Sequence, residues 1–271
     1  MKKLLKSRKG VSNVISTLIL FTVMVSSLGL ALAQIIPAIE NFQTQSNLTA
    51  ATNNFLNIDA VIKQLVNKPV NSSEVVRYGI SNGVLDIYTS GNPIMLIIES
   101  EGILIDESNY TMGELVYVLN GNFKEVSGTI YDFGDPYILV NSINRTAQIT
   151  NIVHQTLEGK KVLKLSYSVF MNVEYVSDNE LEINLILIHL STSKTADGQG
   201  EYFPVINTET KIQIRKQSQV VNSTYLGTYG DFLTIKAQSS DFFQVIEYPL
   251  AQASFDLTLN VMQIYIEFRT I

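Results

Sequence analysis

The chain has 271 residues, of which 46% are hydrophobic and 16% are charged, and it contains no cysteine. The length allows one large domain or two small ones with a sizeable core, and the lack of cysteine excludes disulfides, thiolate catalysis and cysteine-based metal sites. Five of the 19 basic residues precede residue 10, so the rest of the chain has 14 basic against 25 acidic residues, a net charge of −11 that argues against a nucleic-acid partner.

The N-terminus joins a basic cluster to a long apolar run. Residues 10–39 carry no charged side chain, and the run from Val14 to Ile36 has few polar members. As a helix this run would be about 34 Å long, enough to cross a hydrocarbon core. Because the basic cluster lies on its N-terminal side, the N-terminus should stay in the cytoplasm and the body outside. The sequence therefore predicts the membrane as one partner.

Three fates of the apolar run are compatible with its sequence. The pattern Ala31-Leu32-Ala33 before Gln34 is typical of secretory cleavage, which would release the body from the membrane. An apolar region of about 17 residues is long for such a signal, however. An uncleaved run would be a permanent anchor. The third possibility is a cut in front of the run, directly after the basic cluster.

Residues Arg8-Lys9-Gly10 and the following VSNVISTL resemble the class III signal peptide of archaeal type IV pilin-like proteins. The resemblance covers residues 6–66. It implies that the basic leader, residues 1–10, ends in the charged residue Lys9 followed by Gly10. It also implies that a prepilin peptidase cuts between Gly10 and Val11 and discards this leader. It also implies that the retained helix packs among pilin-like subunits in a homo- or heteropolymer. Ile15 stands where bacterial pilins carry a glutamate, so that assembly contact is not implied.

Small residues line one face of the apolar run. Ser26, Gly29 and Ala33 follow each other at helical spacing, and such a stripe would let neighbouring helices approach closely. Pro37 follows the run and should kink the helix or end its first half.

A second helical pattern follows and ends before Pro69, so the transmembrane and amphipathic helix is predicted over residues 11–67. Its apolar positions recur at spacings of three and four residues, which favours a helix whose stripe lies on a β-sheet. They are Leu48, Ala51, Phe55, Ile58, Ile62 and Leu65.

From Val75 the apolar period changes to two, which predicts an extracellular β-rich head over residues 70–271 with about ten or more strands. Ser81-Asn82-Gly83 between two alternating runs indicates a hairpin. In the last alternating run, the apolar residues change from odd-numbered to even-numbered positions near Met262, which would fit a β-bulge. The predicted fold class is α+β, a long kinked N-terminal helix followed by an antiparallel β-sandwich-like head.

Residues that could carry chemistry are few. His154 and His189 lie in separate apolar runs and favour structural roles. Glu99, Glu101, Asp106 and Glu107 could hold Ca²⁺, but a solvated acidic loop is the favoured interpretation. We therefore expect no enzyme activity, no cofactor and no metal site. A surface hydrolase is disfavoured because no recognisable site supports it.

Five N-x-S/T sequons would be open to glycosylation on an outward-facing head: Asn47, Asn71, Asn109, Asn144 and Asn222. The expected function is that of a structural type IV pilin-like subunit, at the cell membrane with an extracellular head or assembled in a surface filament. The large head favours a minor or tip pilin. The alternative is a non-polymerising β-sandwich protein, anchored or secreted, that binds a surface layer, a glycan or a solute.

Overall fold

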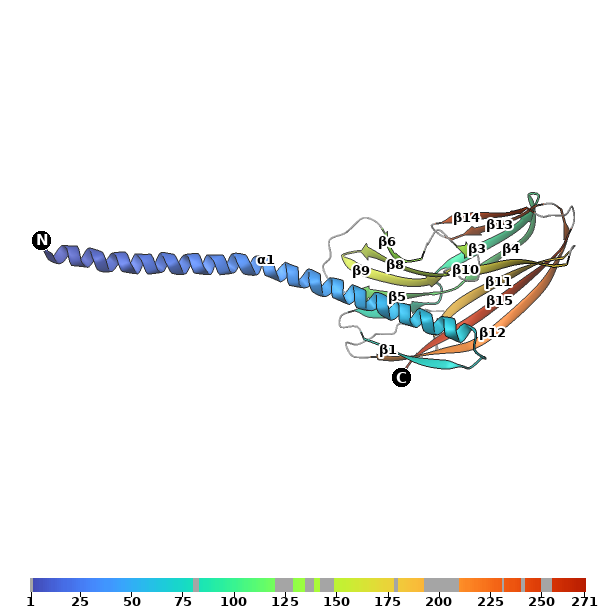
Figure 1. The fold of residues 1–271 in the computed structure, drawn as a ribbon, viewed down its shortest axis with the longest axis horizontal. Coiled ribbons are helices and arrows are strands. Elements are labelled where there is room, and N and C mark those ends of the chain that lie inside the picture. Colours follow the sequence, from blue (N-terminus) through green and yellow to red (C-terminus); the bar gives the residue numbers. More distant parts are fainter. Residues whose placement is uncertain are drawn as a thin grey trace. The chain divides into compact units, whose positions relative to one another are not determined.

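The structure, a computed structural model, describes the backbone of residues 2–79, 83–119, 129–134, 139–141, 149–177, 180–192, 210–230, 232–239, 242–249 and 255–271. Of residues 2–12 only the backbone is described. These ranges contain one helix followed by 15 strands (Figure 1). Their bounds are α1 Lys2–Val66, β1 Ser73–Tyr78, β2 Val84–Tyr88, β3 Pro93–Ser100, β4 Ile103–Thr111, β5 Glu114–Leu119, β6 Thr129–Phe133, β7 Val140–Asn141, β8 Thr150–Leu157, β9 Lys160–Tyr167, β10 Val169–Ser177, β11 Glu180–Thr192, β12 Thr210–Tyr229, β13 Phe232–Gln238, β14 Phe243–Pro249 and β15 Phe255–Thr270.

Helix α1 is continuous and contains Pro37. Proline has no backbone N–H to donate to the carbonyl four residues earlier, but the turns on both sides remain helical. The possibility that Pro37 ends a first helix is therefore wrong. The chain forms two compact units, residues 1–47 and residues 48–271, so the second unit contains the last turns of α1 together with all the strands.

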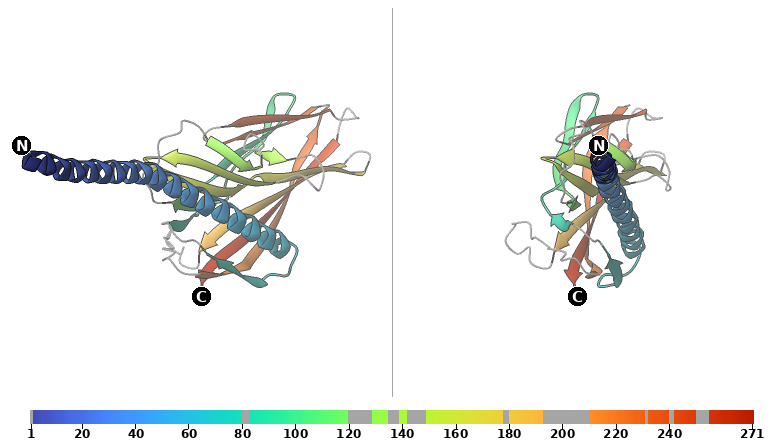
Figure 2. Two further views of the ribbon diagram at one scale, coloured as in Figure 1. Left: turned by 60° about the vertical axis from the view of Figure 1, so that its left-hand side comes forward. Right: turned by 90° about the vertical axis from the view of Figure 1, so that its left-hand side faces the viewer.

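The strands form three sheets. The six-stranded sheet has the order β1-β12-β15-β11-β10-β7, the four-stranded sheet β14-β13-β3-β4 and the five-stranded sheet β2-β5-β9-β8-β6. Most neighbours are antiparallel, and the predicted α+β class is confirmed. No local pattern predicted that β11 and β15 would pair in parallel, as β7 and β10 also do. The long strands β11, β12 and β15 lie side by side in every view (Figure 2).

The head has two hydrophobic cores. The first joins the last turns of α1 to one end of the six-stranded sheet and to the five-stranded sheet. The second lies between the other end of the six-stranded sheet and the four-stranded sheet. Strands β11 and β15 contribute side chains to both cores.

The two cores lie on opposite faces of the six-stranded sheet. In β15, Leu259 and Val261 are buried in the second core, whereas Ile264 and Ile266 are buried in the first. Neighbouring β11 makes the same change of parity after Leu187. The two strands stay in one unbroken register through this region, so odd and even residues point to opposite faces.

The pairing of the strands corrects two predictions. No bulge interrupts β15 near Met262 in its pairing with β11, and the shifts in its pairing with β12 place the extra residues on β12. The parity changes because the core changes face. The predicted hairpin around Ser81-Asn82-Gly83 is also wrong, because β1 pairs with β12 while β2 pairs with β5. Burial of β1 beside α1 outweighs the local turn signal.

Candidate functional site: the N-terminal helix

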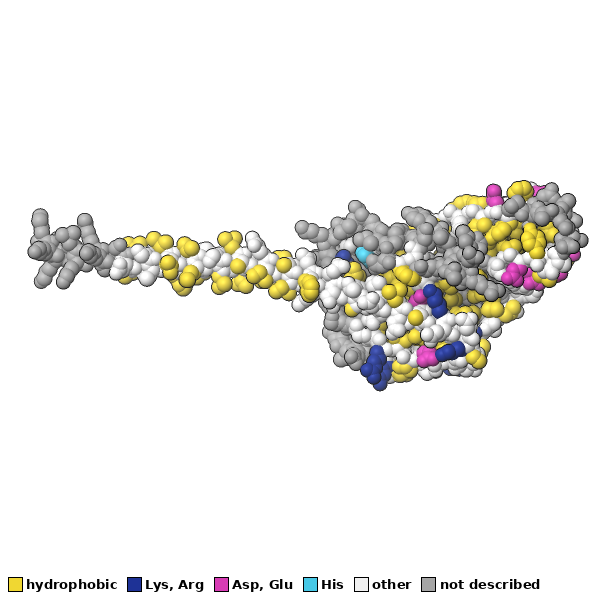
Figure 3. All heavy atoms as spheres, viewed as in Figure 1, with side chains coloured by type: hydrophobic (Ala, Val, Ile, Leu, Met, Phe, Trp, Pro, Cys, Tyr) yellow, Lys and Arg dark blue, Asp and Glu magenta, His cyan; other side chains and the backbone are white. Residues whose placement is uncertain are grey.

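The first half of α1 exposes apolar side chains around its whole circumference. Residues 13–39 are all exposed, including Leu18, Phe21 and Leu30, each more than 60% accessible. Figure 3 shows hydrophobic side chains along the visible face of this segment. By length and composition the helix can cross a membrane, a test that a signal sequence near an N-terminus also passes. This segment is therefore a candidate membrane anchor or signal sequence.

Polar side chains in this segment bond to the helix itself. The Thr17 hydroxyl donates to the carbonyls of Asn13 and Val14, and the Thr22 hydroxyl donates to Leu18 O at 2.8 Å. Ser27 likewise donates to Met24 O. A hydroxyl satisfied within its own helix can enter hydrocarbon or a helix interface without losing a hydrogen bond. These residues therefore do not oppose burial of the run.

The predicted small-residue stripe lies on exposed helix. Ser26, Gly29 and Ala33 are all exposed, and their spacing of three and four residues places them on one face. A Cβ added at Gly29 would meet no atom within 4 Å. Among the described residues, therefore, no neighbour outside the helix's own backbone requires glycine at this position.

The predicted processing site lies within helical backbone. Lys9, Gly10 and Val11 all belong to α1, and their side chains are outside the described part of the structure. The first charged residue beyond this point is Glu40. The helix therefore continues without interruption from the basic leader into the uncharged run.

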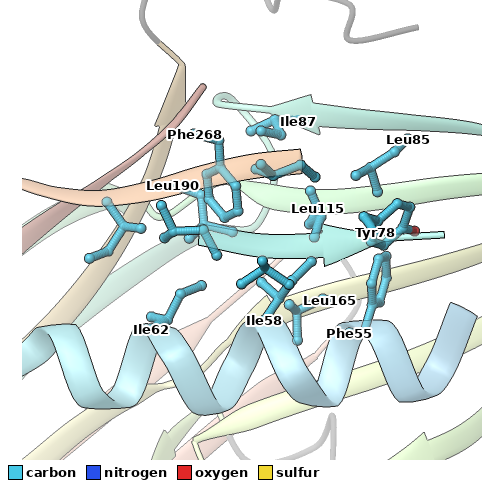
Figure 4. Packing of buried hydrophobic residues seen from close by; sticks show 14 of the residues in the cluster. Phe55, Ile58, Ile62, Tyr78, Leu85, Ile87, Leu115, Leu165, Leu190 and Phe268 are labelled. Atoms are coloured by element: carbon cyan, nitrogen blue, oxygen red, sulfur yellow. The ribbon is translucent and has the colours of Figure 1, made fainter. Parts of the chain in front are cut away.

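The second half of α1 is anchored in the head as the periodicity predicted. All six stripe residues are buried, five of them completely, and these five share the first core with strands of two sheets (Figure 4). The ring of Phe55 stacks with that of Tyr78 at a centroid distance of 6.5 Å. This burial provides the apolar contacts that hold the helix on the sheets.

A buried polar cluster also holds the second half of α1 against the strands. Asp59, on α1, accepts hydrogen bonds from the Thr150 hydroxyl at 2.7 Å and the Tyr167 hydroxyl at 3.2 Å. Lys63, one turn later, lies 2.8 Å from the other carboxylate oxygen. Burial raises the pKa of Tyr167 well above its ordinary value, and the carboxylate of Asp59 raises it further. Since hydrogen bonds are directional, this cluster fixes one register of the helix on β8 and β9.

The C-terminus of α1 is capped by a lysine from a distant strand. The Lys216 ammonium, on β12, donates to the carbonyls of Val66 at 2.8 Å and Lys68 at 2.9 Å. A cation at this end complements the helix dipole and satisfies carbonyls that have no partner within the helix. Burial lowers the pKa of this ammonium. Sequence reasoning missed both Lys216 and Asp59, because the hydrogen bonds that join α1 to the strands connect residues about 90 or more positions apart.

The two histidines do not form a site together. His154 is on β8 of the five-stranded sheet, and His189 is on β11 of the six-stranded sheet. The His189 ring stacks on Tyr265, and its Nδ1 lies 2.8 Å from the Thr111 carbonyl oxygen, to which it donates. Burial lowers the pKa of His189, although the bond to Thr111 opposes this. Both side chains are nearly buried within the head.

The four clustered carboxylates are also separated. Glu99 forms an ion pair with Lys236 at 2.6 Å, and Asp106 accepts from the Ser108 hydroxyl. Asp106 and Glu107 are adjacent on β4 and therefore point to opposite faces, while Glu101 occupies an exposed turn. Among the described residues, no group of three histidine, aspartate or glutamate side chains could hold a metal ion.

The sequons differ in their surroundings. Asn71, Asn109 and Asn222 are exposed, on a turn, on β4 and on β12 respectively. Asn71 has a positive φ of 72° and accepts a hydrogen bond from Arg215. Asn47 is half-buried within α1, and Asn144 lies outside the described residues.

Comparisons with protein-family models, with curated proteins and with solved structures find no match for this chain.

Proposed function

We propose that this chain is a structural cell-surface protein of the type IV pilin-like class, cut between Gly10 and Val11. Its N-terminal helix would anchor it in the membrane and then join a filament core, leaving the β-rich head outside. One observation carries the proposal. A single helix, Lys2–Val66, contains an uncharged and exposed segment over residues 13–39 and a later stripe, Leu48 to Leu65, that is buried in the head. That is the architecture expected of a pilin-like subunit.

The same observation counts against secretory cleavage. A cut after Ala33 would fall inside a continuous helix and leave the anchored half with a new, uncapped start. A cut after Gly10 keeps the whole uncharged run. It also removes the five basic residues that would hold the N-terminus in the cytoplasm. The shortened helix could then leave the bilayer and exchange lipid contacts for helix contacts.

Mass analysis of the mature N-terminus tests this proposal. We expect a start at Val11 in the native host, and retention of the leader in the Gly10→Val variant, because a branched side chain beside the cut bond should block the peptidase. Ala33→Val is the matched control and should leave the start at Val11. A native start at Gln34 would identify a secreted protein, and a start at Met1 a permanent anchor, and either result would refute pilin-like processing.

Assembly through the helix has its own test. Gly29→Leu should reduce the number of filaments, because the larger side chain would keep neighbouring helices from approaching closely at every repeat of this contact. Ala31→Leu, about 200° away around the helix, is the control and should assemble normally. Filaments are counted by electron microscopy at matched protein levels. Equal assembly of the two variants would show that the stripe formed by Ser26, Gly29 and Ala33 is not a packing face.

A further inference from the structure

One side of a long strand is unpaired in the six-stranded sheet. β1 covers β12 over Thr210–Arg215, and backbone bonds from Asn71 and Ser72 extend this cover to Lys216. From Gln217 to Tyr229, β12 pairs with β15 on one side only. Within the described residues, no strand pairs with its other side. We call residues 217–229 of β12 the open edge; unpaired backbone donors and acceptors of this kind are a template for another strand.

The open edge differs from the other edges of these sheets in charge. The sequence from Gln217 to Gly230 contains no charged residue. Proteins commonly protect sheet edges with charges or proline, and the open edge has neither. The described edge strands longer than two residues, β1, β2, β4, β6 and β14, all carry at least one charged residue. These are Glu74 and Arg77, Asp86, Asp106 and Glu107, Asp132, and Glu247.

The open edge also presents apolar side chains on both of its faces. Val221 and Tyr225 are 56% and 63% exposed on one face, and Val220 is 41% exposed on the other. Between the two register shifts, Ser218–Tyr225 pairs evenly with β15. This regular stretch would offer an incoming strand about 26 Å of backbone.

We propose that the open edge pairs with the open edge of a second copy of this chain, in an antiparallel arrangement about a two-fold axis. Two identical strands related in this way match backbone donors to acceptors along their whole length. The open edge brings no charged residue to this pairing, whereas each of the other described edge strands longer than two residues would bring at least one. Val220, Val221 and Tyr225 would lose water-exposed surface at the contact.

Single cysteines test the pairing directly, because the chain has none of its own. The full-length protein is made in a host that does not glycosylate it, since a glycan on Asn222 would obstruct the edge, and is oxidised mildly in detergent. Cysteines are placed in turn from Gln219 to Thr224. A disulfide requires Cα atoms less than about 7 Å apart. We therefore expect cross-linked dimer to peak at one position and fall at its neighbours. The matched control is Asn109→Cys, an exposed sequon asparagine on the charged strand β4.

A charge placed on the edge should abolish the cross-link. In the peak cysteine variant, or with Asn222→Cys if Val221 is itself the peak, Val221→Lys should reduce dimer about fivefold, because the pairing would take the added charge out of water and bring the lysines of the two copies close together. Val245→Lys, at an exposed valine of edge strand β14, should leave it unchanged. A flat cysteine profile, equal cross-linking at Asn109→Cys, or no response to Val221→Lys would each overturn the proposal. It does not rest on the proposed function: failure here leaves N-terminal processing and helix-mediated filaments unaffected.

Discussion

Phe55→Ala is expected to destabilise the head by about 3–5 kcal/mol, the usual cost of removing a fully buried aromatic ring. Phe55 has no exposed surface, stacks with Tyr78 and lies at the centre of the contact between α1 and the sheets. For a unit of this size the loss corresponds to a fall in Tm of about 6–20 °C. Thermal unfolding of the full-length chain in detergent, followed by circular dichroism, measures it.

Phe42→Ala is the matched control on the same helix. Phe42 is 76% exposed, so its removal should change stability by less than about 0.5 kcal/mol. If both variants melt at the same temperature, the last turns of α1 do not belong to the cooperative unit that contains the sheets. A selective effect of Phe55→Ala would show that the helix is part of the head's core.

Stability should fall steeply in alkaline solution, by about 4 kcal/mol per pH unit above pH 10. Burial raises the pKa values of Tyr78, Tyr117 and Tyr167. In the unfolded chain these phenols lose their protons near pH 10, whereas the folded head keeps them neutral. Above pH 10 these three phenols therefore let the folded state bind up to three more protons than the unfolded state, and raising the pH favours unfolding. The contribution is fully present below pH 10 and disappears as the pH approaches the folded pKa values.

Urea unfolding between about pH 9 and pH 11 measures this slope. Tyr78→Phe should reduce it by about 1.4 kcal/mol per pH unit, because one buried phenol is removed. The Tyr78 hydroxyl has no hydrogen-bond partner among the described residues, so this variant should fold. Tyr225→Phe, at an exposed tyrosine, should leave the slope unchanged. A slope that Tyr78→Phe does not alter would place the alkaline sensitivity elsewhere.

Patterns close together in sequence predicted well. The spacing of Leu48, Ala51, Phe55, Ile58, Ile62 and Leu65 identified the buried stripe residue by residue, because a helix repeats its faces every few residues. Alternation likewise predicted a β-rich head with about ten or more strands after Val75, and the described residues contain 15. The exposed apolar half of α1 was visible as a run without charge. Each of these signals is contained within one element.

Pairings between distant segments could not be read in the same way. The turn signal at Ser81-Asn82-Gly83 suggested a hairpin, but β1 pairs with β12 and β2 pairs with β5. The contacts of Asp59 and Lys216 join α1 to strands that no local pattern connects with it. The change from odd-numbered to even-numbered apolar residues near Met262 is real, but the predicted cause, a bulge, was wrong. One strand cannot reveal that a second core covers its opposite face.

The reversal of the buried face along β11 and β15 makes the head indivisible. A protein with two hydrophobic cores would ordinarily have a place where one half could be gained or lost during evolution. Here each long strand supplies both cores, and no break in the pairing of β11 with β15 separates them. Deleting either half would expose apolar side chains of strands that the other half needs. The head could therefore grow or shrink only at its outer strands and turns, while the paired centre had to arise as one piece.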